Sequence, residues 1–198
     1  MKVDPIEIFY KHNGWLRMSE ALKHGISRYT LYSLLDKGII EQVSRGVYCL
    51  TNLPGVSNPD LFAVASRCPK AVICLISALS FHEITTQIPH RVDIAIPRNS
   101  YRPRIDWPPT CVHEFSDQAY QMGIEEHNMG GMIVKIYDME KTLVDCFRFR
   151  NIYGGIGIVI EALEFYRDEK EVNYKKIMEY AKICRVDKSM QPYLEKIL

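Results

Sequence analysis

Residues 25–50, GISRYTLYSLLDKGIIEQVSRGVYCL, determine how the N-terminal part of the chain folds. Ser27 is a good helix N-cap, because its hydroxyl can accept a backbone N–H that the first helical turn leaves unpaired. Leu31, Leu34 and Leu35 then recur at helical spacing and give the segment one apolar stripe. The stretch therefore predicts a helix that begins after Ser27 and buries one side.

An extended segment follows this helix and folds back on itself. Gly38 suits the left-handed position that commonly ends a helix. Strand-forming residues occupy 39–43 and 47–50, and the turn residues Ser44-Arg45-Gly46 between them place Arg45 at or beside the tip of a hairpin. A helix followed by a hairpin with a basic tip is the pattern of a winged helix-turn-helix, which puts the helix in the major groove of DNA. The alternative is a small α/β packing module whose polar face meets only water.

The residues before this stretch supply the rest of a helix-turn-helix. Asp4-Pro5-Ile6-Glu7 combines an N-cap, a proline at the first helical position and an acidic third residue, so a first helix is expected over residues 5–11. A short extended piece and a second helix fit residues 15–23, before the turn at His24-Gly25. Residues 1–52 are therefore predicted to form a winged helix-turn-helix DNA-binding domain.

The predicted DNA contacts are polar, aromatic and basic side chains on or near the exposed side of the third helix. Arg28 is the best candidate for reading a guanine edge, and the hydroxyls of Ser27 and Thr30 beside the helix N-terminus suit a phosphate. The full set is Arg17, Ser27, Arg28, Tyr29, Thr30, Tyr32, Ser33, Lys37 and Arg45. Residues 1–50 carry seven Lys and Arg against five Asp and Glu. Because this excess is small, binding should depend on specific contacts or on several copies of the protein.

A second domain is predicted at residues 56–198, after a linker at 51–57 that is rich in turn-forming residues. One strand is expected near 91–97 and a buried helix over most of 71–83. The remaining expected helices are 58–67, one that begins at 138, and 156–168, 173–184 and 190–198, and the remaining strands are 111–115, 124–127 and 132–137, the last two joined by a turn at 128–131. The fold class is α+β, with a small antiparallel or mixed sheet and several helices after the winged helix.

Composition limits the function classes. With 47% apolar residues the chain can form true cores, but it has no run of the roughly 18 apolar residues that a membrane span needs. No apolar run follows the basic start, so no signal peptide is expected. Six cysteines are scattered singly without a Cys-x-x-Cys pair, which argues weakly against structural zinc and favours reduced thiols in a cytoplasmic protein.

No catalytic pattern stands out in the second domain, and we expect neither enzyme activity nor a metal or cofactor. The segment 154–157, GGIG, lacks the Lys-Ser/Thr of a phosphate-binding loop. His82, on a largely apolar helix, is better explained as a hydrogen-bonded core histidine than as a base or metal ligand. Asp93 and Asp106 have no partner at a spacing that suits two-metal chemistry.

Lys141, Asp145 and Arg148 are the most suggestive polar set in the second domain. Their spacing of three and four residues places them together on one side of a helix. Two interpretations stay open. The set is either a charge-paired helix face or a polar contact with a binding partner.

The chain also resembles a known family, the antitoxins of AbiE-type (type IV) toxin–antitoxin systems, over nearly its whole length. The resemblance is carried by residues 25–50, by CLISALSFHEITTQIPHRVDIAIP at 74–97 and by IYDMEKTLVDCFRFRNIYGGIGIVIEALEFY at 136–166. It implies an N-terminal winged helix that binds the promoter of its own operon, and a C-terminal domain that counters a nucleotidyltransferase-like toxin encoded beside it. The matching positions are Arg45, Gly46, Val47, Tyr48, Ser77, Ala78, Leu79, His82, Thr85, Pro89, Lys141, Thr142 and Asp145.

Two classes of function are therefore expected. The first is a DNA-binding antitoxin of a type IV system that represses its own operon, with operator DNA and the cognate toxin as partners and no membrane. The second is a one-component transcriptional regulator whose C-terminal domain binds a small ligand. A nuclease is a third and weaker option.

Overall fold

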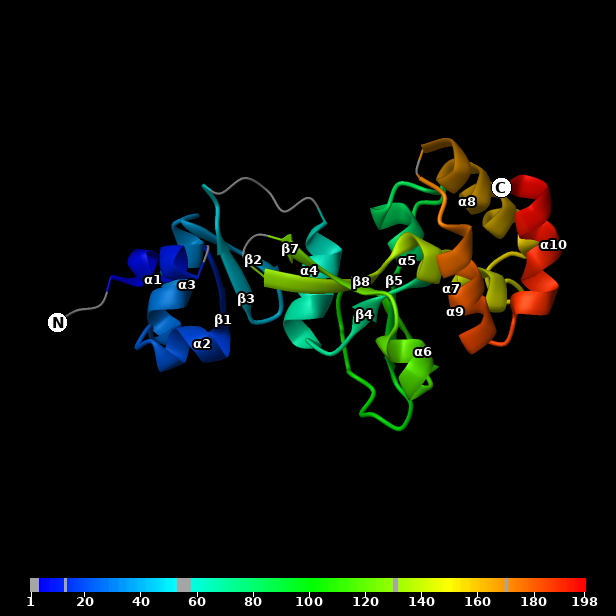
Figure 1. The fold of residues 1–198 in the computed structure, drawn as a ribbon. Helices are drawn as coiled ribbons and strands as arrows, with labels where there is room; N and C mark the ends of the chain where they lie inside the picture. Colours follow the sequence, from blue (N-terminus) through cyan, green and yellow to red (C-terminus); the bar gives the residue numbers. More distant parts are fainter. Residues whose placement is uncertain (1–3, 13, 53–57, 130–131, 170) are drawn as a thin grey trace.

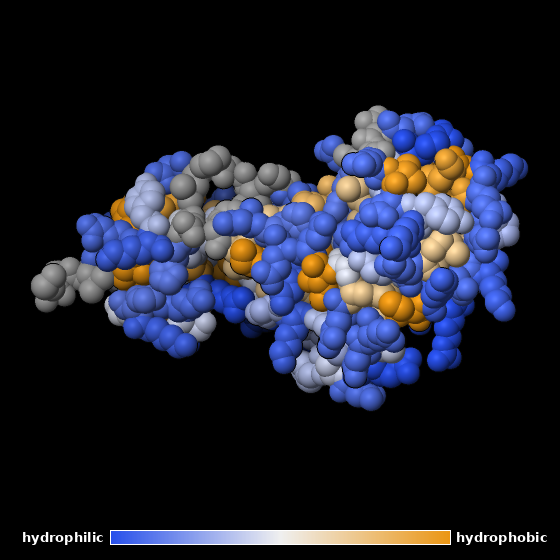
Figure 2. Space-filling model, in the orientation of Figure 1, coloured by the Kyte–Doolittle hydropathy of each residue, from blue (hydrophilic) through white to orange (hydrophobic). Residues whose placement is uncertain are grey.

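The structure is a computed structural model that describes residues 4–12, 14–52, 58–129, 132–169 and 171–198. Figure 1 shows helices α1, α2 and α3 and a small sheet at the N-terminal end, a larger sheet in the middle and helices α7–α10 at the other end. Figure 2 shows that hydrophilic side chains dominate the visible face of the N-terminal part, whereas apolar surface gathers among the C-terminal helices.

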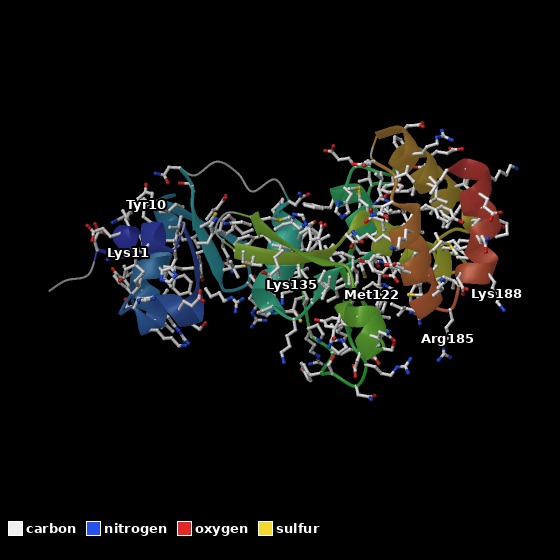
Figure 3. The ribbon with its side chains drawn as sticks, viewed as in Figure 1. Tyr10, Lys11, Met122, Lys135, Arg185 and Lys188 are labelled. Carbon is white, nitrogen blue, oxygen red and sulfur yellow. The ribbon has the colours of Figure 1, made fainter. Side chains whose placement is uncertain are left out.

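The N-terminal part has the predicted winged-helix order. Its elements are α1 (Pro5–Lys11), β1 (Trp15–Arg17), α2 (Met18–Lys23), α3 (Arg28–Asp36), β2 (Ile40–Ser44) and β3 (Val47–Leu50). The strands pair antiparallel in the order β1-β3-β2. Phe9, Leu16, Leu31 and Tyr48 lie in one buried cluster that draws on all three helices and the sheet. Asn52 Nδ2 donates to the Tyr10 hydroxyl over 2.7 Å, which ties the chain after β3 back to α1. Figure 3 labels Tyr10 on this helix.

The remainder is a mixed sheet covered by helices, which confirms the α+β class. Its five strands lie in the order β6-β5-β4-β8-β7, with parallel pairs β5·β6 and β4·β8 and antiparallel pairs β4·β5 and β7·β8. The elements are α4 (Pro59–Arg67), β4 (Val72–Ile73), α5 (Leu75–Phe81), β5 (Val92–Pro97), β6 (Thr110–Phe115), α6 (Asp117–Gln121), β7 (Ile124–Met129), β8 (Met132–Tyr137), α7 (Met139–Arg148), α8 (Ile156–Glu169), α9 (Tyr174–Ile183) and α10 (Asp187–Ile197).

The two faces of this sheet pack against different helices. Val92, Ile94 and Ile96 alternate along β5 and join a buried cluster with Leu61 and Val64 of α4. Ala95, on the opposite face, joins the larger cluster that contains residues of α5, α7, α8, α9 and α10. Alternation along a strand thus sends one set of side chains toward α4 and the other toward the helical end of the molecule.

The prediction of one buried helix over most of 71–83 is wrong at its start. Val72 and Ile73 form the central strand β4, which pairs with β5 on one side and β8 on the other, and α5 begins only at Leu75. A strand buried on both faces reads as a continuous apolar run, which periodicity cannot separate from a buried helix. Helix α6 was not predicted. Residues 53–57 of the predicted linker and residues 130–131 of the predicted turn lie outside the described residues.

The N-terminal elements touch the larger sheet region through α4. The rings of Trp15 and Phe62 lie 3.9 Å apart between centroids, and Phe62 is completely buried. Arg67 Nη2 donates to the carbonyl oxygen of Arg45 over 2.8 Å. The division into domains 1–52 and 56–198 stays a prediction. Because of these contacts, removing residues 1–52 would expose the Phe62 ring to solvent.

An ion pair is buried in the larger core, where the sequence predicted a charge-paired or partner-binding helix face. Lys141 and Asp145 are both fully buried and paired with each other on α7. Burial raises the pKa of the Asp145 carboxyl, and the Lys141 ammonium acts in the opposite direction. Of the two interpretations, the charge pair within the helix agrees with the structure for these two residues, and the partner contact does not, because a partner cannot reach side chains that are fully buried.

Replacing Lys141 by Ala should strongly destabilise the protein. The change leaves the Asp145 carboxylate buried without its cation, which typically costs about 3–5 kcal/mol. Urea denaturation should show this loss, whereas Lys141→Met combined with Asp145→Leu should recover most of it. Lys176→Ala is the control, since that lysine is partly exposed where it meets Asp138 and Glu140. A loss for Lys141→Ala no larger than that of the control would contradict the assigned role.

Candidate nucleic-acid interface and a polar cluster on the second sheet

Helix α3 buries one side and exposes the other. Leu31 and Leu34 are buried in the N-terminal cluster. Arg28 and Lys37 are exposed at the two ends of the helix, and the side chains of Tyr29 and Tyr32 are 83% and 49% exposed. Tyrosine is enriched at interfaces, because its ring is apolar and its hydroxyl is polar, so two exposed tyrosines three residues apart give this face the character of a binding surface.

Two hydroxyl groups lie at the start of α3, and one of them has a proton that it can donate to a ligand. Ser27 Oγ accepts the backbone N–H of Thr30 over 3.1 Å and lies 2.9 Å from Thr30 Oγ1. Only one of the two hydroxyl protons can sit between these oxygens. The other is available to donate to a phosphate oxygen at the helix N-terminus, where the peptide dipoles also favour negative charge.

The wing is anchored to the start of α2. Gly46 has φ +77°, a conformation that glycine adopts without strain, and its carbonyl oxygen accepts the N–H of Met18 over 2.8 Å. Arg17 pairs across the sheet with Val47, so this cation lies beside the wing. Arg45, at the tip, has a side chain that is 86% exposed.

A carboxylate from the β5–β6 connection approaches the wing. Asp106 Oδ2 lies 3.7 Å from Arg45 Nη1 and 3.9 Å from Arg67 Nη1. Asp106 is itself 67% exposed, so water screens the pair and it contributes little to stability. Arg45 is therefore free to exchange this partner for a phosphate.

The structure places the residues predicted to contact DNA on α3 and beside the wing, both in the N-terminal part of the protein. Ser27, Arg28, Tyr29, Thr30, Tyr32, Ser33 and Lys37 come from α3 and its caps, and Arg17 and Arg45 come from the wing side. Arg148 is the member of the predicted partner-binding set that reaches partial exposure. Its guanidinium carbon lies 5.7 Å and 5.3 Å from the ring centroids of Phe115 and Phe149.

His82 has the structural role that the sequence favoured. Its Nε2 lies 2.7 Å from the carbonyl oxygen of Tyr137, at the end of β8. Burial lowers the pKa of the imidazole, so the ring is held neutral and donates to that carbonyl.

A polar cluster that sequence reasoning missed lies on β5, β6 and the turn after α7. The Asp93 carboxylate is buried, and its Oδ1 is 2.5 Å from the Tyr153 hydroxyl and 3.1 Å from His113 Nε2. Arg91 Nε lies 3.6 Å from the same oxygen. Burial and the Asp93 carboxylate raise the pKa of the Tyr153 hydroxyl far above its ordinary value. The Cys-x-His spacing at 111–113 is a signal that could have pointed to this cluster, because alternate strand residues share a face.

Two cavities offer room for small molecules. One of about 570 Å³ is lined by basic and aromatic side chains that include Arg67, Lys70, Tyr101 and Arg104. Another of about 360 Å³ has Arg91, Asp93 and Tyr153 in its wall. The larger one reaches the wing through Arg67, which contacts Arg45 as described above.

The fold and the exposed face of α3 define a winged helix-turn-helix followed by a mixed α+β region. Residues 5–51 match the family described as "Transcriptional regulator, AbiEi antitoxin". The AbiE-type resemblance is thus confirmed for the N-terminal segment, which is similar to that family over these residues. The match spans the predicted winged helix and leaves the larger sheet region outside it.

A solved structure resembles most of the fold. The Rv2827c protein from Mycobacterium tuberculosis superposes with a TM-score of 0.61 at 12% sequence identity, over 89% of this chain and 69% of that one. At this identity the likeness concerns the fold alone. No curated protein gives a significant match. Among the residues that the structure describes, no helix has the length and apolar character needed to cross a bilayer.

Arg28→Ala should weaken binding to a cognate DNA site by about 1–3 kcal/mol and relax the preference for one base pair. The reason is that Arg28 is exposed at the start of α3 and can present its planar fork to a guanine. Gel shifts with the chain's own promoter and with single-base variants of it measure both effects. Lys23→Ala is the control, since it removes an exposed cation of α2 outside the predicted set. Equal behaviour of the two variants would refute base reading by Arg28.

Proposed function

We propose that the protein is a DNA-binding antitoxin that represses its own operon and counteracts a nucleotidyltransferase-like toxin encoded beside it. The observation that carries the proposal is the exposed face of α3, with Arg28, Tyr29 and Tyr32, beside the wing tip Arg45. This arrangement falls within the segment that matches a family of transcriptional regulators. Such a protein acts in the cytoplasm, where its operator lies.

DNA recognition in this proposal divides between two elements. Helix α3 enters the major groove, where Arg28 reads a base edge and the tyrosines pack against sugars and thymine methyl groups. The hydroxyl left free at Ser27 and Thr30 donates to a phosphate. Arg45 reaches the backbone or a narrow minor groove next to it. The low net charge of the segment makes these specific contacts the main source of affinity.

Toxin neutralisation is assigned to the region after residue 58, which acts in the proposal by binding and not by catalysis. Lys141 and Asp145 support α7 from inside the core, so they serve neutralisation only by maintaining the fold. Arg148 is the member of the predicted set whose partial exposure allows a direct contact with a partner.

A one-component regulator is the second candidate, and the cavity of about 570 Å³ favours it. A small anion held by Lys70 and Arg104 in that cavity would also meet Arg67. Because Arg67 donates to the carbonyl oxygen of Arg45, a ligand that moves the Arg67 side chain would change a contact that holds the wing. An anion-dependent thermal shift together with altered operator affinity would favour this candidate.

Co-expression with the adjacent gene separates the two candidates. If that gene encodes a toxin, the full chain should restore growth, and a chain with both Arg28→Ala and Arg45→Ala should restore it equally well while failing to repress the promoter. DNA contacts and neutralisation are then separate activities. A failure of the wild-type chain to protect cells, combined with a ligand-dependent change in repression, would favour the one-component regulator.

Arg45→Ala should weaken binding to all DNA sequences by a similar factor. If Arg45 contacts a phosphate, the slope of log affinity against log salt should fall by about one unit. Operator affinity at several salt concentrations measures this, and a thermal melt should stay unchanged because the side chain is exposed. Asp106→Asn is the matched change, since it removes the competing carboxylate and should modestly raise affinity. An unaltered salt slope in Arg45→Ala would remove the wing tip from the interface.

A further inference from the structure

The register of two neighbouring strands brings three metal-ligand side chains together. Strands β5 and β6 run parallel, with Asp93 opposite Cys111 and Ala95 opposite His113. Cys111 and His113 share one face of β6 because they are two residues apart. The small Ala95 leaves room for the imidazole to reach Asp93. One ligand atom of each of Asp93, Cys111 and His113 lies within 4.8 Å of the other two.

Two donor groups serve three short contacts at this point. The Tyr153 hydroxyl is 2.5 Å from Asp93 Oδ1 and 2.7 Å from His113 Nε2, and these last two atoms are 3.1 Å apart. The hydroxyl brings one proton, the imidazole nitrogen at most one, and the carboxylate none. To fill all three contacts, one of the two donors must therefore be shared between two acceptors. A cation at this point would instead attract all the lone pairs.

We propose that Asp93, Cys111 and His113 bind a divalent transition-metal ion of the zinc class. The donor set of one thiolate, one imidazole and one carboxylate suits Zn²⁺, which takes nitrogen, sulfur and oxygen ligands in tetrahedral geometry. The Tyr153 hydroxyl donates to the Asp93 carboxylate and orients it, as partners of metal ligands commonly do. This site lies in the larger sheet, away from α3.

The distances and charges fit such an ion with a small adjustment. Tetrahedral zinc keeps its ligand atoms about 3.3–3.6 Å apart, given bonds of about 2.0–2.3 Å. Asp93 and His113 are already near this separation, and the Cys111 thiol closes the remaining gap by rotating about its Cα–Cβ bond. The thiolate and the carboxylate together neutralise a dication. Arg91, whose side chain is 47% exposed, can then turn from Asp93 toward water.

Cobalt titration of the full-length, chelator-treated protein tests the site directly. Tetrahedral Co²⁺ bound by a thiolate should give intense visible bands and a sulfur-to-metal charge-transfer band, at one ion per chain, and Zn²⁺ should displace it. Cys111→Ser should abolish the charge-transfer band, and Cys68→Ser should leave it unchanged. Tyr153→Phe should keep the band and weaken affinity about tenfold or more, since it removes only the orienting hydrogen bond. Absence of the band in the wild type would overturn the proposal.

Thiol alkylation of the wild type gives a second readout that does not depend on a change at the proposed ligands. Cys68 and Cys111 are the two partly exposed thiols, and the other four cysteines are buried. Zn²⁺ should protect Cys111 from alkylation and leave Cys68 reactive, as peptide mapping would measure. The exposed pair His12 and His24, with Nε2 atoms 3.0 Å apart, could hold a metal without sulfur. Repeating the experiment in His24→Gln excludes that background. Equal alkylation of Cys111 with and without Zn²⁺ would refute the site.

Discussion

The buried ammonium of Lys141 is the constraint on which the larger half of the structure depends, because a charge removed from water must be compensated on every side. Asp145 supplies the counter-charge. The rings of Phe115 and Tyr137 lie 4.7 Å and 4.3 Å from the nitrogen and add cation–π attraction. These rings stand at the ends of β6 and β8, so one charge fixes α7 against two strands. A Cβ at Gly123 would lie 2.7 Å from the Lys141 Cβ, and only glycine fits there.

The N-terminal unit depends on this half through a small and mixed junction. The Trp15 ring packs on Phe62 of α4, and Arg67 of the same helix holds the wing backbone at Arg45. The apolar contact fixes distance, whereas the exposed ion pairs with Asp106 can exchange with solvent or phosphate. Helix α4 thus positions the wing without covering the exposed side of α3.

Local sequence signals predicted most of the helices and the hairpins. They could not predict which distant strands pair with one another. The cap at Ser27, the proline at Pro59 and the glycine after α3 each act within a few residues, so the element limits near them were read correctly from the sequence. Burial of Lys141 could not be read in this way, because a helix face looks the same whether it meets water or two aromatic rings. The Asp93 cluster depends on the β5–β6 register, which joins residues about 20 positions apart.

The proposed metal site and the wing are connected by the loop between β5 and β6, and magnitudes indicate what that connection can do. Asp106, which pairs with Arg45, lies in this loop shortly before Cys111. A ligand shifts an equilibrium only by its difference in affinity between the two states. The Arg45–Asp106 pair is largely exposed, and such pairs contribute at most about 1 kcal/mol. Metal binding could therefore change operator affinity several-fold at most through this route. Its main effect would fall on the stability of the β5–β6 edge, where the ligands lie.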